Sequence, residues 1–116
     1  MYIYRLQILS SKSYSEEQLN NVIGVSSNFL YANWGIEIIQ SGENFSEILV
    51  YFLSLLEGKY EKLESIGISR ENISIWVLYE YEGQCNMEYD PVSMKKIGEN
   101  GIVLCISCWE KEGELS

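Results

Sequence analysis

Apolar and polar side chains alternate most clearly between Ile73 and Tyr81. One set of alternate positions holds Ile73, Ile75, Val77, Tyr79 and Tyr81, and the other holds Ser74, Trp76, Leu78 and Glu80. A period of two places successive side chains on opposite faces of a strand. Because both sets contain large apolar side chains, we predict a central strand here, at the start of the stretch 73–109 around which the fold is organised.

Alternation also predicts strands at residues 2–9, 34–39 and 102–109. A further brief strand is expected at residues 29–31. After a turn at Glu82-Gly83, residues 84–89 are expected to return as the hairpin partner of the central strand.

Three stretches have helical signals. Ser15 followed by Gln18 predicts a capping box, and Gly24 is suited to end that helix in a left-handed conformation. Ser46 is the predicted cap of a long helix that ends at Gly67. Gly58 interrupts this helix, and since glycine inside a helix costs roughly 1 kcal/mol relative to alanine, we expect a kink or two helices.

The third helix is predicted to begin at Asp90-Pro91, because aspartate is a good cap and proline suits the first helical position. Met94 and Ile97 are expected to face inwards, and Gly98 to end the helix. The order of elements predicts one α+β domain over residues 1–116. Its single sheet is expected to be mixed or mostly antiparallel, with helices on one face and a frayed acidic tail at residues 110–116.

Charge narrows the class of partner. The 116 residues have a net charge of −9 and a sequence pI near 4.4. No basic residue lies between Lys12 and Lys59, or between Arg70 and Lys95. This argues against binding to nucleic acid or to anionic membranes, which requires clustered lysine and arginine. Acids that share a face would steer a basic partner, whereas the alternative is a solvated surface that maintains solubility.

The chain has no histidine, which removes the commonest general base and zinc ligand. Cys105 and Cys108 have the spacing of redox and zinc motifs, but positions three apart on a strand point to opposite faces. We therefore expect buried structural thiols. No phosphate-binding glycine motif occurs.

Glu80, Glu82 and Glu88 lie across the predicted hairpin, where they could converge as a divalent-cation site or an acid and base pair. The alternative is an acidic edge that discourages aggregation. We favour this alternative, and therefore expect no enzymatic activity, cofactor or metal site.

The last third of the chain resembles the bacterial family called domain of unknown function 4279. The motifs that support this resemblance are Gly83-Gln84-Cys85-Asn86-Met87-Glu88-Tyr89, Asp90-Pro91 with a helix ending Lys96-Ile97-Gly98, and Gly101-Ile102-Val103-Leu104 leading to Cys105-Ile106-Ser107-Cys108-Trp109. The amino-terminal half matches by its first strand, its Ser15-Glu16-Glu17-Gln18 helix start and Gly24. It departs from the family pattern at residues 25–34.

Small acidic proteins that look like this one are similar to immunity proteins of bacterial toxin systems, including contact-dependent growth inhibition. The resemblance implies a protein that binds a basic toxin domain, of nuclease type, and covers its active site. An anionic chain with three cysteines, an odd number, and no apolar run long enough for a bilayer is expected in the cytoplasm.

Nine tyrosines and three tryptophans supply candidate anchors for such an interface. The residues we expect to contact the partner are Glu80, Glu82, Glu88, Tyr79, Tyr81 and Trp34. The alternative function is a small-molecule or regulatory sensor with an aromatic pocket. The sequence does not predict the oligomeric state.

Overall fold

The computed structural model describes residues 1–29 and 31–112. Its centre is a 4-stranded mixed sheet in the order β2-β1-β3-β4. The strands are β1 (Tyr2–Ile8), β2 (Trp34–Gln40), β3 (Ile73–Tyr81) and β4 (Val103–Glu110). β1 is antiparallel to both β2 and β3, whereas β4 is parallel to β3. The predicted α+β class is confirmed, and β3 lies inside the sheet as expected.

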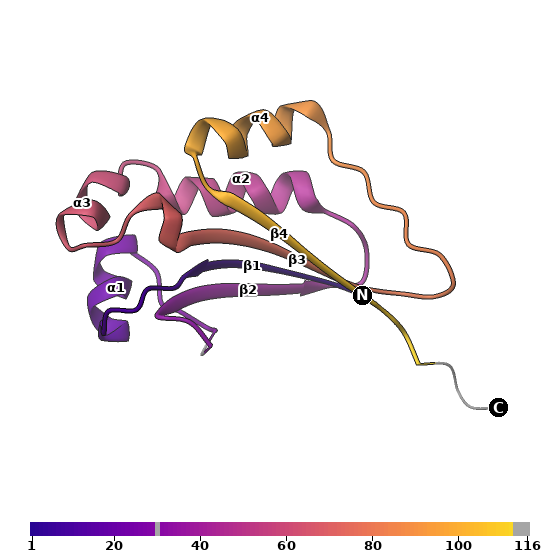
Figure 1. The fold of residues 1–116 in the computed structure, drawn as a ribbon, viewed down its shortest axis with the longest axis horizontal. Helices are drawn as coiled ribbons and strands as arrows, with labels where there is room; N and C mark the ends of the chain where they lie inside the picture. The colour runs from indigo at the N-terminus through magenta and orange to yellow at the C-terminus, as the bar shows by residue number, and fades with distance from the viewer. Residues whose placement is uncertain (30, 113–116) are drawn as a thin grey trace.

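Helices cover one face of this sheet. The helices are α1 (Glu16–Ile23), α2 (Phe45–Leu56), α3 (Tyr60–Ser65) and α4 (Pro91–Asn100), with a short 3-10 turn, η1 (Arg70–Asn72), before β3. Figure 1 shows α2 running along the sheet with α4 beside it, while α1 and α3 lie together at one end. α4 connects the parallel strands β3 and β4, because a parallel pair needs a crossover connection.

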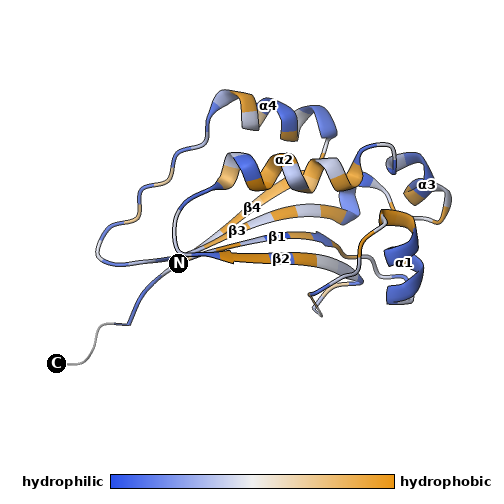
Figure 2. Cartoon of the chain, turned by 180° about the vertical axis from the view of Figure 1, so that it is seen from behind, coloured by the Kyte–Doolittle hydropathy of each residue, from blue (hydrophilic) through white to orange (hydrophobic). Residues whose placement is uncertain are grey.

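The core lies between the helices and one set of alternating strand positions. The buried side chains include Tyr4, Leu6 and Ile8 of β1, Ile73, Ile75 and Val77 of β3, Trp34 and Ile36 of β2, and Leu49 and Phe52 of α2. Apolar residues are concentrated on the strands and on α2 (Figure 2). The opposite set on β3, Ser74 to Glu80, is only half-buried. The two sets therefore lie on opposite faces of β3, as the period of two predicts, and the set with Ile73, Ile75 and Val77 is the buried one.

The brief strand expected at residues 29–31 is wrong for Phe29 and Tyr31, while Leu30 lies outside the described residues. Instead of a strand, the side chains of Ser27 and Asn28 form hydrogen bonds with the outer edge of β2. The side-chain amide of Asn28 accepts a hydrogen bond from Glu37 N at 2.7 Å through its Oδ1, and donates one to Glu37 O at 3.1 Å through its Nδ2. The Ser27 hydroxyl accepts from Gly35 N at 3.0 Å. Ser and Asn side chains compete with regular backbone pairing in this way.

The expected hairpin of residues 84–89 with β3 is also wrong. Both edges of β3 are already paired, one with β1 and the other with β4. Residues 84–89 instead run without regular structure towards α4, as the chain after β3 shows in Figure 1. The chain thus has four strands in its sheet instead of the five or six expected.

Helix boundaries are partly as predicted. The Ser15 hydroxyl accepts from Gln18 N, Gly24 ends α1 with φ 95°, and Asp90 with Pro91 begins α4. Gly58, with φ 75°, separates two helices, α2 and α3. The long helix, however, begins after Asn44 and not at Ser46, with the Glu43 carboxylate accepting from Phe45 N at 2.7 Å.

The predictions for α4 contain two further errors. Met94 is 57% exposed, and Ser93 lies inside beside Ile97. The helix continues through Gly98 and ends at Gly101, which adopts φ 66°. Gly101 can take this left-handed conformation at no steric cost, whereas Gly98 retains an ordinary helical conformation.

Within residues 1–29 and 31–112, none of the helices combines the length and apolar character needed to cross a membrane.

Candidate functional site

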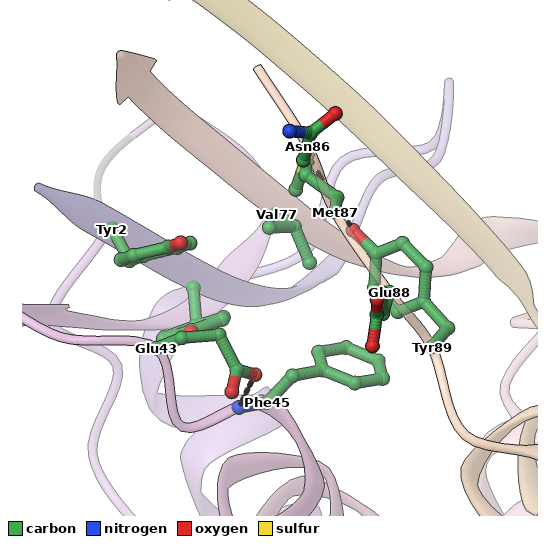
Figure 3. A pocket seen from close by; sticks show the side chains of 9 residues that line it. Tyr2, Glu43, Phe45, Val77, Asn86, Met87, Glu88 and Tyr89 are labelled. Carbon is green, nitrogen blue, oxygen red and sulfur yellow. Dashed lines mark hydrogen bonds between the residues drawn. The ribbon is translucent and has the colours of Figure 1, made fainter. Parts of the chain in front are cut away.

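An aromatic pocket forms where the start of β1, the start of α2 and the segment before α4 meet over β3. Its volume is about 110 Å³. The lining residues are Tyr2, Tyr4, Glu43, Phe45, Val77, Asn86, Met87, Glu88 and Tyr89. Val77 is the contribution of β3, and Figure 3 shows it between Tyr2 on one side and Met87 and Tyr89 on the other. We call this the aromatic pocket.

Each aromatic wall is held by its neighbours. Tyr2 stacks on Tyr79 with ring centroids 4.4 Å apart and lies nearly parallel to Tyr4. The Phe45 and Tyr89 rings meet edge to face at 5.1 Å. The Tyr4 hydroxyl accepts from Asn44 N at 2.9 Å, which fixes the start of α2 against β1. The pocket therefore has several preorganised ring faces, each carrying the negative side of an aromatic quadrupole.

Two carboxylates lie beside these rings. Glu43 precedes α2, and its side chain accepts from Phe45 N at 2.7 Å, a bond drawn in Figure 3. The amino terminus of a helix favours a negative charge, so this carboxylate is stabilised where it lies. Glu88 approaches from the opposite side, next to Tyr89 (Figure 3).

The aromatic pocket adjoins an open groove of about 630 Å³. We call it the acidic groove, because Glu43, Glu88 and Asp90 all line it, together with Phe45, Ser46, Tyr89 and Pro91. Among the described residues that line the pocket or the groove, none is a lysine or an arginine. Lys96 lines a separate hollow that shares Ser46 and Asp90 with the groove. Glu43 and Glu88 therefore lie in cavities without a cation among the described lining residues.

The tyrosines of the pocket resist ionisation. Burial, followed by its contact with Tyr79, raises the pKa of Tyr2 to about 12. Burial, followed by neighbouring groups that include Tyr4 and Glu43, raises the pKa of Tyr89 to about 12. Both phenols are therefore neutral across the physiological range, and an additional negative charge is disfavoured inside the pocket.

The structure does not bring the predicted partner-binding residues together. Trp34 is fully buried, and its indole N–H donates to Asn20 Oδ1 at 3.1 Å. It is a core residue that cannot contact a partner, so this prediction is wrong.

The three predicted acids also separate. Glu80 lies on the uncovered face of the sheet and accepts from the Trp109 indole at 3.3 Å. Glu82 pairs with Lys111 at 3.4 Å. Glu88 lies on the covered side, at the aromatic pocket. The shared cation site or acid and base pair considered from the sequence therefore has no geometry to support it.

Tyr79 and Tyr81 project from β3 on the covered side, half-buried, with ring centroids 6.2 Å apart. Tyr79 supports Tyr2 of the aromatic pocket. Of the predicted set, Glu88 lines the pocket and Tyr79 backs it.

Cys105 pairs in register with Trp76 and Cys108 with Tyr79, so the two thiols lie on opposite faces of β4 as predicted. They are not fully buried, however: Cys105 is half-buried and Cys108 is exposed. In the part of the chain that the structure describes, no three acidic, cysteine or histidine side chains gather closely enough to hold a metal ion.

Sequence reasoning missed Tyr2, Tyr4, Glu43, Phe45 and Tyr89 as site residues. They come from three distant stretches, and only the packing of α2 on β1 joins the first four. One local signal was available, since Glu43 stands just before the apolar stripe of α2, where a carboxylate stabilises a helix start.

Comparisons of the chain with protein-family models, with curated proteins and with solved structures found no match. The resemblance to the family called domain of unknown function 4279 rests on the sequence motifs alone.

Proposed function

We propose that this protein is an immunity protein, which binds a basic toxin domain in the cytoplasm and covers its active site. The observation that supports this most directly is the acidic groove. Three carboxylates line it, on Glu43, Glu88 and Asp90, and none of its described lining residues is a lysine or an arginine. Such a surface attracts a basic protein and repels an acidic one.

The whole chain reinforces this preference. A net charge of −9 steers a basic domain towards the protein from a distance, and raises the rate of encounter. Close contact then depends on a few desolvated anchors, and rigid aromatic side chains are the usual ones. The aromatic pocket offers Tyr2 and Tyr89 beside the groove. The mechanism is steering by charge followed by anchoring at the pocket.

The size of the aromatic pocket bears on the alternative, a sensor of small molecules. Pockets for metabolites and drugs have volumes of about 300–1,000 Å³. The aromatic pocket measures about 110 Å³, which suits one side chain better than a whole metabolite. A thermal-shift screen with metabolites tests the sensor directly, and a saturable rise in melting temperature with one of them would favour it.

The immunity proposal predicts that a secreted protein with a toxic carboxy-terminal domain is encoded immediately upstream, and this domain is the partner to test. We expect the purified chain to bind this domain in calorimetry and to abolish its toxicity when both are expressed. Glu43→Gln/Glu88→Gln should weaken binding about tenfold or more, since buried charge pairs at interfaces contribute strongly. Glu61→Gln/Glu64→Gln changes the net charge equally at exposed sites on α3 and should retain binding.

α3 is a suitable control because it lies at the opposite end of the molecule from the start of α2 (Figure 1). A chain that binds no toxin domain from its own genomic neighbourhood would overturn the proposal.

A further inference from the structure

We infer that the aromatic pocket is a receptor for the ammonium group of a lysine side chain. The identity of the partner that presents this lysine rests on the proposed function. The chemistry of the pocket does not, because it follows from the rings and carboxylates of this chain.

Aromatic rings enclose the pocket on several sides. A cation within about 6 Å of a ring centroid is attracted by the negative face of the ring, and the attraction grows when water is excluded. Tyr2, Tyr4, Phe45 and Tyr89 all line the pocket. Figure 3 shows Tyr2 and Tyr89 on opposite sides with Phe45 between them. A group that enters the pocket therefore meets rings on several sides.

Two carboxylates give the pocket a negative charge. Glu43 is fixed at the pocket by its bond from Phe45 N, and Glu88 lies across from it. Burial is the main cause that raises the pKa of Tyr2 and of Tyr89, and Glu43 adds the smallest of the other contributions to both. The lining thus disfavours another anion. An ammonium group would be attracted both by the carboxylates and by the ring faces.

The shape of the pocket suits a lysine side chain. Val77 and Met87 give the pocket an apolar lining in addition to its rings. Lysine has an apolar four-carbon arm that can contact such a lining, with a compact charge at its end. The guanidinium of arginine is planar and wide, and prefers to stack on one ring or to grip one carboxylate with both ends of its fork. A small pocket enclosed by rings suits the compact group.

The experiment is an NMR titration of the full chain with three blocked amino acids. The probe is lysine with its α-amino group acetylated and its carboxyl group blocked as the methylamide, so that the side-chain ammonium is free. The norleucine amide, blocked in the same way, has a similar apolar arm without the charge, and the arginine amide carries the planar cation. The methyl signals of Val77 and Met87 report on the pocket from within.

We expect saturable shifts of both methyl signals with the lysine amide, and affinities at least about tenfold lower for the norleucine amide. The arginine amide should also bind more weakly than the lysine amide. Equal binding of the norleucine amide would overturn the inference, because the charge would then contribute nothing. Equal or tighter binding of the arginine amide would overturn the assignment to an ammonium group.

Variants separate the contribution of the carboxylates from that of the aromatic rings. Glu43→Gln/Glu88→Gln retains an acceptor for Phe45 N but removes both charges, and should weaken lysine binding about tenfold. Tyr89→Leu removes one ring and should weaken it about three- to tenfold. Glu61→Gln/Glu64→Gln on α3 should leave lysine binding unchanged. Because Tyr89→Leu removes a contact with Phe45, its melting temperature is measured alongside its affinity. If Tyr89→Leu is unstable, Glu43→Gln/Glu88→Gln still tests the inference.

This test is independent of the toxin experiment. If the pocket binds the lysine amide but the chain binds no toxin domain, the pocket assignment stands and the immunity proposal fails. If the lysine amide gives no shift, while the toxin domain binds to the chain and binds more weakly to Glu43→Gln/Glu88→Gln, the pocket assignment fails and the immunity proposal stands.

Discussion

Gly35 shows how one residue sets the position of a whole segment. A methyl group built at Gly35 would lie 2.8 Å from Phe29 Cδ1 and 3.3 Å from the carbonyl oxygen of Leu6. Phe29 is buried over this glycine, and the Arg5 guanidinium lies 4.5 Å from the centre of its ring. The absence of a side chain at residue 35 therefore allows Phe29 to pack on the sheet.

Gly35→Ala should destabilise the protein by about 1–3 kcal/mol, the usual cost of overpacking. Urea denaturation gives this free energy of unfolding. Gly98→Ala is the matched control, because a methyl group there meets nothing within 4 Å and Gly98 lies within a helix. Alanine should stabilise that helix by roughly 0.5–1 kcal/mol. Equal effects of the two substitutions would contradict this account of Gly35.

Residue identity alone did not distinguish the roles of the aromatic side chains. Trp34 and Tyr2 are each the first residue of a strand, yet Trp34 is buried and Tyr2 lines an open pocket. The difference arises from α1, whose Asn20 accepts the indole N–H of Trp34. Contacts between distant residues decide such roles, and a periodic pattern does not contain them.

At the scale of elements, Gly58 separates α2 from α3. It adopts φ 75°, a left-handed conformation, and a methyl group there would meet nothing within 4 Å. The cost of a side chain is therefore one of backbone conformation only, in contrast to Gly35.

Gly58→Ala should lower the free energy of unfolding by about 1–2 kcal/mol, the cost of a left-handed conformation for an L-residue. Gly58→Asn should cost less, because asparagine tolerates this conformation. Chemical denaturation of both variants measures the difference. An asparagine variant less stable than the alanine variant would show that the space around residue 58 matters after all.

The stability that the Asp90 cap gives to the start of α4 depends on pH. Asp90 accepts from Ser93 N at 3.0 Å and from the Ser93 hydroxyl at 2.6 Å. These two bonds, the hydroxyl bond first, lower the pKa of Asp90 below its ordinary value of 3.8. Since the folded pKa is lowered, the ionised cap stabilises the protein at pH values above 3.8. This stabilisation is lost as the pH falls through the folded value.

Asp90→Ala should therefore lower the melting temperature at pH 7, and the difference from the wild type should shrink as the pH falls below 3.8. Thermal unfolding followed by circular dichroism between pH 7 and pH 2.5 measures it. Ser93→Ala removes the hydroxyl bond, and should move this loss of stability to higher pH. A difference between Asp90→Ala and wild type that stays constant down to pH 2.5 would contradict the coupling.

Local signals predicted elements well, and pairing between elements poorly. The caps at Ser15 and Asp90 and the break at Gly58 depend on neighbours within a few residues, and all three were predicted. The supposed hairpin of residues 84–89 depended on which edge of β3 was free. β1 and β4 occupy both edges, and neither pairing is encoded near residue 84.

The whole molecule concentrates negative charge in a small volume. The net charge is −9 and the radius of gyration is 15.4 Å. In the described residues, only two salt bridges join side chains that are far apart in the sequence. They are Arg5 with Glu37 at 2.6 Å and Lys111 with Glu82 at 3.4 Å. Most acids therefore repel one another, and the folded state holds them closer than the unfolded chain does.

Salt should relieve this repulsion. The Debye length is about 30 Å at 0.01 M salt and about 8 Å at 0.15 M, so at low salt the charges interact across the entire molecule and at physiological salt only with near neighbours. We expect the melting temperature to rise between these concentrations. About 1 kcal/mol of relieved repulsion would correspond to roughly 4 °C in a domain of this size.

A charge variant tests whether the rise comes from repulsion. Glu57→Lys/Glu64→Lys changes two exposed acids and brings the net charge from −9 to −5. Because repulsion grows faster than linearly with net charge, this variant should lose about half or more of the salt-dependent rise. It should also be the more stable of the two proteins at 0.01 M salt. If the wild type and the variant responded equally to salt, the rise would reflect ion binding or hydration, and the acidic surface would cost the fold nothing. The expected result instead means that the fold tolerates a repulsive surface whose attraction for a cationic partner is greatest at low salt, where its own stability is lowest.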